Sequence, residues 1–230
     1  MNQAATPRFF LPEGPLILAS SSRTRHQMLA NAGMDFVTHA PNIDEISVRH
    51  SATASGMPAE DIAVLLADMK AHKAAQAAMM GDVEGASVSG FVLGSDQILF
   101  CEGEILAKPT SEAEAVEQLG FLAGKDHHLL TAAVIYQNNE RIWHHLAKPC
   151  LSMRKMDADF IARYVAAIGD SAFYSAGSYQ IEGYGAHLFS AIKGCSYAVM
   201  GLPLLEVLGF LRVRGLGLGD VGGDIVGAAE

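Results

Sequence analysis

The sequence lacks several features that would assign it to a common class of protein. It has three cysteines in 230 residues, without a CxxC spacing, which argues against a disulfide-built secreted domain and fits a reducing compartment. Its first 15 residues contain no basic segment followed by an apolar core, so they do not indicate a signal peptide. The most apolar window, 198–211, is interrupted by Pro203 and Glu206 and is too short to span a bilayer. We therefore expect a cytoplasmic protein without membrane contact.

Positive charge is also scarce. The 16 Lys and Arg residues are outnumbered by 25 Asp and Glu residues, and the formal net charge is −9. This balance argues against a nucleic-acid-binding protein, which normally presents a basic face. It leaves room for a small polyanionic ligand, because local cations can reverse the field within one site. The composition leaves the oligomeric state open, with a homodimer as one candidate.

Apolar patterns of both strand and helix type occur along the chain and predict an α/β protein. We expect strands at 16–19, 36–38 and 91–100, and an antiparallel pair at 127–137 and 141–153. Helices are expected after residue 22 and at 59–80, 111–122, 157–167 and 203–211. Segment 48–58 is expected to be a loop, and 174–190 an irregular, strand-rich region. We expect an extension at 1–15, a main domain at 16–213 and a loose glycine-rich tail at 214–230.

The most informative motif is LASSSRTR at 18–25. With the two residues before it, the motif runs from four apolar residues (16–19) into three hydroxyls and two guanidiniums. This pattern indicates a buried strand, a polar turn and a helix. Such a turn aims backbone N–H groups and a helix N-terminus outward, where they attract phosphate, and an arginine adds a planar fork for phosphate oxygens. The alternative is an ordinary strand–turn–helix in which Ser22 is only the helix N-cap.

A second informative motif is GSDQ at 94–97, inside an otherwise apolar strand. A buried carboxylate is costly unless it has a partner or a metal ion. Asp96 is therefore a candidate general base or ligand for a hard divalent cation. The alternative is a strand end at which Asp96 caps a neighbouring turn.

Other charged residues give weaker signals. Pro109 fixes the backbone after Lys108, which is expected at a strand–helix junction, but most lysines are solvated surface charges. Lys70, Glu45 and Glu182 are ambiguous for the same reason. Two pairs of adjacent histidines, at 127–128 and 144–145, could suggest a metal site. Neither pair can chelate one ion by itself, because adjacent residues of a strand face opposite ways.

Together these segments resemble the Maf-like family of nucleoside triphosphate pyrophosphatases from Leu16 to about Leu211, and they occur in the family's order. The motifs are LASSSRTR at 18–25, IDE at 43–45, KA at 70–71, GSDQ at 94–97, KP at 108–109, LAGKDH at 122–127, TA at 131–132, AGSYQIEG at 176–183 and GLPL at 201–204. Each motif is unspecific by itself, whereas their ordered series over one domain is specific.

The resemblance implies an elongated α/β, mixed-sheet, Maf/ITPase-like fold with two lobes around a central nucleotide-binding cleft. It implies hydrolysis of nucleoside triphosphates to the monophosphate and pyrophosphate with Mg²⁺ or Mn²⁺. Asp96 is similar to the family's proton acceptor, and Asp96 and Glu45 would hold the metal. The phosphate-binding residues would be Ser20, Ser22, Arg25, Lys70 and Lys108. An alternative from another class is a nucleotide-binding regulator of cell division that does not hydrolyse its ligand.

Base preference stays open because the resemblance gives conflicting signals. The first motif departs from the family's usual Ser-x-Ser-Pro-Arg-Arg, with Arg23 at the proline and Thr24 at the first arginine. The branch that acts on 7-methyl-GTP usually has tryptophan at the position of Thr24. Gln97 and Glu182 instead resemble that same branch, since the branch acting on dTTP and UTP has threonine and glutamine there. We therefore treat a 7-methyl-GTP-specific enzyme as an alternative.

Overall fold

The computed structural model describes residues 8–219, which form two compact units. The first comprises residues 8–96, 132–146 and 201–219, and the second comprises 97–131 and 147–200. One boundary between them falls inside a strand, between Asp96 and Gln97. No helix within residues 8–219 is long and apolar enough to cross a membrane.

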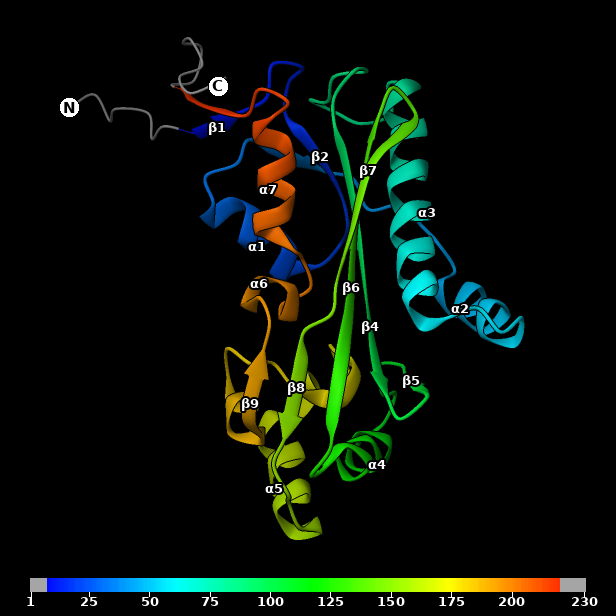
Figure 1. Ribbon diagram of the computed structural model, residues 1–230, viewed down its shortest axis with the longest axis vertical. Helices are drawn as coiled ribbons and strands as arrows, with labels where there is room; N and C mark the ends of the chain where they lie inside the picture. The colour runs from blue at the N-terminus through cyan, green and yellow to red at the C-terminus, as the bar shows by residue number, and fades with distance from the viewer. Residues whose placement is uncertain (1–7, 220–230) are drawn as a thin grey trace, which may run out of the picture. The chain divides into compact units, whose positions relative to one another are not determined.

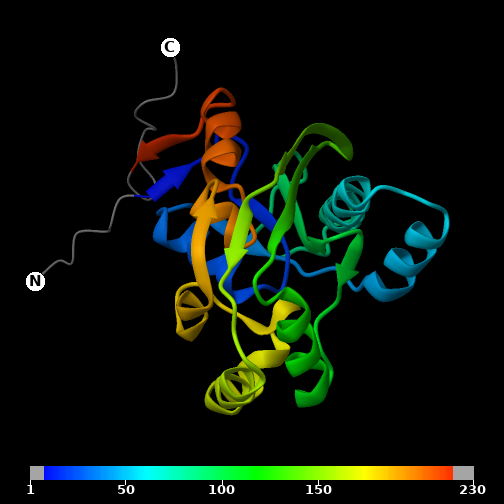
Figure 2. The ribbon, with the colours of Figure 1, turned by 60° about the horizontal axis from the view of Figure 1, so that its bottom comes forward.

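The first unit is a sheet with helices on both sides. Its strands β3, β2, β4 and β6 lie in that order, and β2 pairs in parallel with both β3 and β4. Figures 1 and 2 show α3 on one side of β2 and β4, and α1 and α7 on the other. The elements are β1 (Arg8–Phe10), β2 (Leu16–Ala19), α1 (Arg23–Asn31), β3 (Phe36–Thr38), α2 (Glu45–Ala54), α3 (Ala59–Met79), the start of β4 (Val92–Cys101), the end of β6 (Asp126–Gln137), most of β7 (Glu140–Ala147), α7 (Leu204–Arg212) and β10 (Gly217–Gly219).

Close packing of α3 on β4 is the main constraint in this unit. Every residue of β2 is fully buried, as expected for a parallel strand with both faces covered. The buried face of α3 consists largely of alanines, so its backbone can approach the sheet closely. Gly94 of β4 lies at the contact, where an added Cβ would clash with the carbonyl oxygen of Ala67 and lie 2.7 Å from the amide nitrogen of Ala71. The sequence therefore needs glycine at 94 for steric reasons.

The second unit packs two helices and several short turns against an antiparallel sheet, β6–β8–β9. Its core contains Leu119 and Leu122 of α4 with Ile161 and Val165 of α5, all buried. The elements are the end of β4, β5 (Glu104–Leu106), α4 (Glu112–Leu122), the start of β6, β8 (Cys150–Met153), α5 (Ala158–Ile168), the 3₁₀ helices η1 (Gly169–Phe173), η2 (Ala176–Ser178) and η3 (Tyr184–Leu188), β9 (Phe189–Lys193) and α6 (Ser196–Val199).

Most of the expected strands and helices are confirmed, but the expected loop at 48–58 is wrong, and 174–190 is irregular as expected without being rich in strands. Segment 48–58 is mainly helical, because Asp44 caps α2 by accepting a hydrogen bond from the amide of Ser47 at 3.0 Å and α2 packs on α3. The region 174–190 is built mainly from 3₁₀ turns, with a strand only from Phe189 onward. The second strand of the expected antiparallel pair is divided into β7 and β8 around Pro149, which has no amide hydrogen to donate.

The glycine-rich end is not entirely a loose tail. Gly217–Gly219 form β10, which pairs antiparallel with β1, so that Arg8 lies opposite Gly219. The expectation is therefore wrong for these three residues. The rest of the expected tail, residues 220–230, lies outside the described residues.

The neighbouring histidines His127 and His128 face opposite sides of β6, as expected for strand residues. His127 is fully buried and its Nε2 lies 2.7 Å from the hydroxyl of Tyr179, whereas His128 is exposed. Burial lowers the pKa of His127 from 6.5 to about 4, helped by the charge of His128 and opposed by Asp126. His127 is thus a neutral core residue of the second unit at physiological pH.

We expect Gly94→Ala to lower the free energy of unfolding by about 1–3 kcal/mol, the usual cost of overpacking a core. The cause is the clash with α3, since alanine is otherwise the better residue within a strand. Urea denaturation measures the change. The matched control is Gly120→Ala on α4, where an added Cβ meets nothing within 4 Å. It should be neutral or stabilising, and equal effects of both substitutions would contradict the steric argument.

The stability of the protein should fall on acidification partly through His127. Its pKa is lower in the folded state than in the unfolded chain, so its contribution is complete above pH 6.5 and is lost as the pH falls toward 4. Between pH 7.5 and pH 5 this loss amounts to about 2 kcal/mol. Urea denaturation at both pH values should show a smaller decrease for His127→Gln than for the unsubstituted protein. His128→Gln should retain nearly the full decrease, and identical decreases for all three would refute the assignment.

Candidate functional site

The turn after β2 is stabilised by its own serines. Ser22 caps α1 by accepting a hydrogen bond from the amide of Arg25 at 3.4 Å, which is the role that the alternative interpretation of this motif gave it. Ser20 accepts two hydrogen bonds at 3.2 Å, one from the amide of Ser22 and one from Nη1 of Arg25. The amides of Ser22 and Arg25 are therefore engaged within the turn. Any ligand at this helix N-terminus would use the neighbouring amides and the guanidinium of Arg25.

Arg25 is a buried cation rather than a surface one. Only 9% of the residue is exposed, and its Nε donates to the carbonyl oxygen of Gly201 at 2.7 Å. Burial lowers the pKa of the guanidinium, and the negative charges of Asp96 and Glu45 oppose this shift. An arginine nevertheless keeps its proton in a protein, so Arg25 provides a fixed positive charge. Its electrostatic coupling to Asp96 and Glu45 links the turn to the carboxylates.

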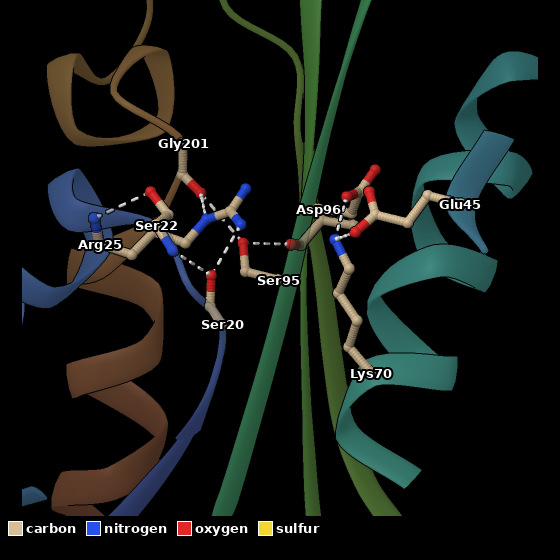
Figure 3. Close-up of polar contacts among 9 residues, drawn as sticks. Ser20, Ser22, Arg25, Glu45, Lys70, Ser95, Asp96 and Gly201 are labelled. Carbon is tan, nitrogen blue, oxygen red and sulfur yellow. Dashed lines mark hydrogen bonds and ion pairs between the residues drawn. The ribbon is translucent and has the colours of Figure 1, made fainter. Parts of the chain in front are cut away.

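A lysine lies between two carboxylates beside β4. The Nζ atom of Lys70, on α3, is 2.7 Å from Oδ1 of Asp96 and 2.8 Å from Oε1 of Glu45, the first residue of α2 (Figure 3). The side chain of Asp96 is 6% exposed and that of Lys70 is 10% exposed, whereas that of Glu45 is 38% exposed. The lysine supplies the partner that a buried Asp96 requires.

The alternation of β4 places neighbouring polar residues on opposite faces. Asp96 points toward α3 and Lys70, whereas Ser95 points toward Arg25 and Gly201 (Figure 3). The register of β4 on β2 sets Gly94 opposite Ala19, the last residue of β2. Ser95 and Asp96 therefore lie where β2 gives way to the serine turn. This is the carboxyl end of a parallel strand, where α/β sheets commonly bind ligands.

One oxygen of Asp96 has no partner in the protein. Its Oδ1 accepts a hydrogen bond from Lys70, but Oδ2 is buried without a hydrogen bond. A buried polar atom in this state is uncommon and indicates a water, an ion or a catalytic role. The three charges of Glu45, Lys70 and Asp96 sum to −1, which suits a cation. Asp96 and Glu45 thus fit a magnesium-type site, in which one or two carboxylates hold the ion and substrate phosphates complete its coordination.

The protein alone supplies only part of such a coordination shell. Within residues 8–219, no group of three or more His, Cys, Asp or Glu side chains is placed to hold a metal ion. The two carboxylates share their lysine, so a bound cation needs oxygens from water and substrate. The arrangement therefore favours a metal ion that arrives with a phosphate ligand over a permanently bound one.

The remaining predicted site residues are distributed over both units. Thr24 lies in the first turn of α1 and is partly buried. Lys108 belongs to the second unit and is exposed between β5 and α4, with Pro109 buried after it. Glu182 is exposed between η2 and η3. The roles given to them in phosphate binding or base preference stay predictions.

Gln97 is held by its amide nitrogen. Its Nε2 donates to Oγ1 of Thr131 at 2.8 Å and to the carbonyl oxygens of Ala198 and Val199 at 2.9 and 3.1 Å. These partners all lie in the second unit. The nitrogen side of the amide is thus used within the protein, which leaves the carbonyl side of Gln97 for any ligand.

Sequence reasoning missed Ser95 and Gly201. Both stand in recognised motifs, GSDQ and GLPL, but no role was assigned to either. Ser95 is fully buried, and its hydroxyl lies 2.8 Å from the carbonyl oxygen of Ala132 and 3.0 Å from that of Gly201. A serine inside an apolar strand was the available signal, because a buried hydroxyl needs a hydrogen-bond partner.

Comparison with known proteins agrees with the motif series. The family model described as "Maf-like protein" matches residues 15–214. A "Nucleoside triphosphate pyrophosphatase" of Ruegeria pomeroyi is 41% identical over 202 residues, which are 88% of this chain and 97% of the relative. A protein of the same name from Rhodospirillum rubrum is 39% identical over 202 residues, 88% of this chain and 96% of the relative.

A third relative carries a narrower name. The "7-methyl-GTP pyrophosphatase" of Brucella abortus is 39% identical over 197 residues, which are 86% of this chain and 94% of the relative. The family match covers most of the chain and includes every residue of the predicted site. The chain therefore belongs to the family of Maf-like proteins.

Proposed function

We propose that this protein is a nucleoside triphosphate pyrophosphatase, an enzyme that hydrolyses the bond between the α- and β-phosphates of its substrate. Relatives at about 40% identity over nearly their whole length carry that name. The single observation in the structure that supports the chemistry best is the unpaired, buried Oδ2 of Asp96 beside Lys70. Such an oxygen can accept a proton or bind a cation.

In the proposed reaction, Asp96 accepts a proton from a water molecule. The water oxygen bonds to the α-phosphorus while the bond from this phosphorus to the bridging oxygen breaks, and pyrophosphate leaves with the electron pair. Lys70 and Arg25 supply positive charge to the phosphate oxygens, and we include Lys108 on the basis of its motif. Reactions of this kind are accelerated mainly by positioning and by electrostatic stabilisation of the transition state.

We further propose that Mg²⁺ or Mn²⁺ is held by Asp96 and Glu45 together with the triphosphate. When bound, the cation would neutralise phosphate charge and lower the pKa of a coordinated water. Besides supplying charge to the phosphates, Lys70 would then hold the two carboxylates in one place before the substrate arrives. Without Lys70, the like charges of Asp96 and Glu45 would repel each other.

The orientation of Gln97 favours a guanine-type base as a second, narrower candidate. Because its amide nitrogen is engaged, Gln97 would present a carbonyl oxygen, and Glu182 presents a carboxylate. Both groups only accept hydrogen bonds in these states. The Watson–Crick edge of guanine carries two adjacent donors, N1–H and the 2-amino group, whereas that of uracil or thymine carries one. This supports a guanine-type substrate, of which 7-methyl-GTP is one, although Thr24 stands where tryptophan is usual in the 7-methyl-GTP branch.

The activity test is pyrophosphate release from dTTP, UTP, CTP and 7-methyl-GTP with Mg²⁺. Asp96→Asn should lower turnover at least about a hundredfold on every substrate, because it removes the proton acceptor. The matched control is Asp68→Asn, which alters another ion-paired carboxylate of the first unit, 3.3 Å from Arg141. It should keep near-normal turnover. Release of orthophosphate instead would indicate a phosphatase, and binding without turnover would indicate the regulatory alternative.

Metal binding can be tested without turnover. Electron paramagnetic resonance should detect Mn²⁺ bound to the protein in the presence of an α,β-methylene nucleotide, which the enzyme cannot cleave. Asp96→Asn should weaken that binding at least about tenfold, because a coordinating carboxylate oxygen is lost. Glu45→Gln should also weaken it, and Asp68→Asn should not. Unchanged Mn²⁺ affinity in both site variants would mean that these carboxylates are not the ligands.

A further inference from the structure

The hydroxyl of Ser95 and the side chain of Arg25 share one acceptor. The carbonyl oxygen of Gly201 accepts a hydrogen bond from Nε of Arg25 at 2.7 Å and lies 3.0 Å from Oγ of Ser95 (Figure 3). A carbonyl oxygen has two lone pairs, so it can accept hydrogen bonds from both groups at once. The three residues come from β4, α1 and the segment before α7. Their contact therefore ties together three parts of the first unit.

These contacts fix the plane of the Arg25 guanidinium. Gly201 holds Nε, and the hydroxyl of Ser20 holds Nη1 at 3.2 Å. Because the guanidinium is planar, two acceptors at different nitrogens determine its orientation. The Nη2 group is used by neither contact, and it is the part of the side chain best placed to donate to a phosphate oxygen.

Ser95 in turn holds the Gly201 carbonyl in place. The serine is fully buried and its hydroxyl also faces the carbonyl oxygen of Ala132 on β6, at 2.8 Å. Gly201 has a φ of +101°, so its backbone has a conformation that other residues rarely adopt, and an added Cβ would lie 3.6 Å from the guanidinium. The single hydroxyl proton of Ser95 is donated either to Ala132 or to Gly201, and when it is donated to Gly201 it supplies one of the two hydrogen bonds that hold this carbonyl.

We propose that Ser95 is a positioning residue, which orients the guanidinium of Arg25 toward the substrate triphosphate through the carbonyl of Gly201. The proposal rests on the proposed pyrophosphatase function and adds a residue to it. Ser95 does not touch the substrate. Ser95 also directly precedes Asp96 on β4. Two neighbouring residues of this strand thus position the Arg25 guanidinium on one face of the sheet and carry the proposed proton acceptor on the other.

The test is a double-mutant cycle between Ser95 and Arg25 in the full chain. Ser95→Ala should raise KM for the best substrate about tenfold and change kcat by less than about threefold, because it weakens binding of phosphate before and during the reaction. In an Arg25→Ala background, Ser95→Ala should change KM by less than about twofold, since Ser95 acts through Arg25. Ser95→Cys, nearly isosteric but a weaker donor, should give an intermediate KM.

A serine outside the site serves as the control. Ser190 donates to the carbonyl oxygen of Ser152 at 3.1 Å in the second unit, and Ser190→Ala should leave KM unchanged. An unchanged KM in Ser95→Ala, or effects of Ser95 and Arg25 that multiply in full, would overturn the proposal. Absence of pyrophosphate release by the unsubstituted protein would overturn the proposed function instead. In that case the same cycle is measured as the dissociation constant of the α,β-methylene nucleotide, with the same expected pattern.

Discussion

The approach of α3 to β4 determines whether the site can exist. Lys70 lies on α3 between Ala67 and Ala71, the two residues that face Gly94 across the contact. Only a glycine at this position lets the helix lie close enough for Lys70 to reach Asp96, two residues further along the same face of β4. The small side chains of α3 serve the same purpose. A packing constraint in the apolar core thus sets the distance between Lys70 and Asp96.

This ion pair explains how a carboxylate can remain in the middle of a buried strand. Removing one partner of a buried pair typically costs about 3–5 kcal/mol, because the other charge is left without compensation. Lys70 compensates Asp96 through one oxygen only, and the second oxygen stays unpaired. The folded state therefore retains part of the free-energy cost of burying this carboxylate, as is common at functional sites. A bound cation or a proton from water would satisfy that oxygen.

The sequence predicted the parts of the site that depend on local pattern. The strand before the serine turn, the capping of α1 by Ser22 and the burial of Asp96 follow from residue type and spacing within a few positions. The family resemblance placed Lys70 and Asp96, 26 residues apart, at the same site, but it did not predict that they pair with each other. The acceptor for Arg25 could not be predicted, since Gly201 lies 176 residues away and contributes only its backbone. Backbone carbonyls have no signature in a sequence.

The same distinction between local and distant information explains the error at α2. Its residues are mostly small and polar, with one buried alanine, so the apolar period that identifies helices is weak. The helix forms because Asp44 caps it and α3 lies against it. The cap is the residue immediately before Glu45, so it also fixes the start of the helix at the residue that reaches Lys70. The motif IDE thus contains both the cap of the helix and the carboxylate that pairs with Lys70.

The boundary between the two units inside β4 separates two neighbouring polar residues that have different hydrogen-bond partners. Asp96, the last residue of the first unit in this strand, is paired by Lys70 within that unit. Gln97, the next residue, is held by Thr131, Ala198 and Val199 within the second. Because the two side chains depend on different surroundings, a substitution that alters the hydrogen bonds of Gln97 need not disturb the ion pair of Asp96.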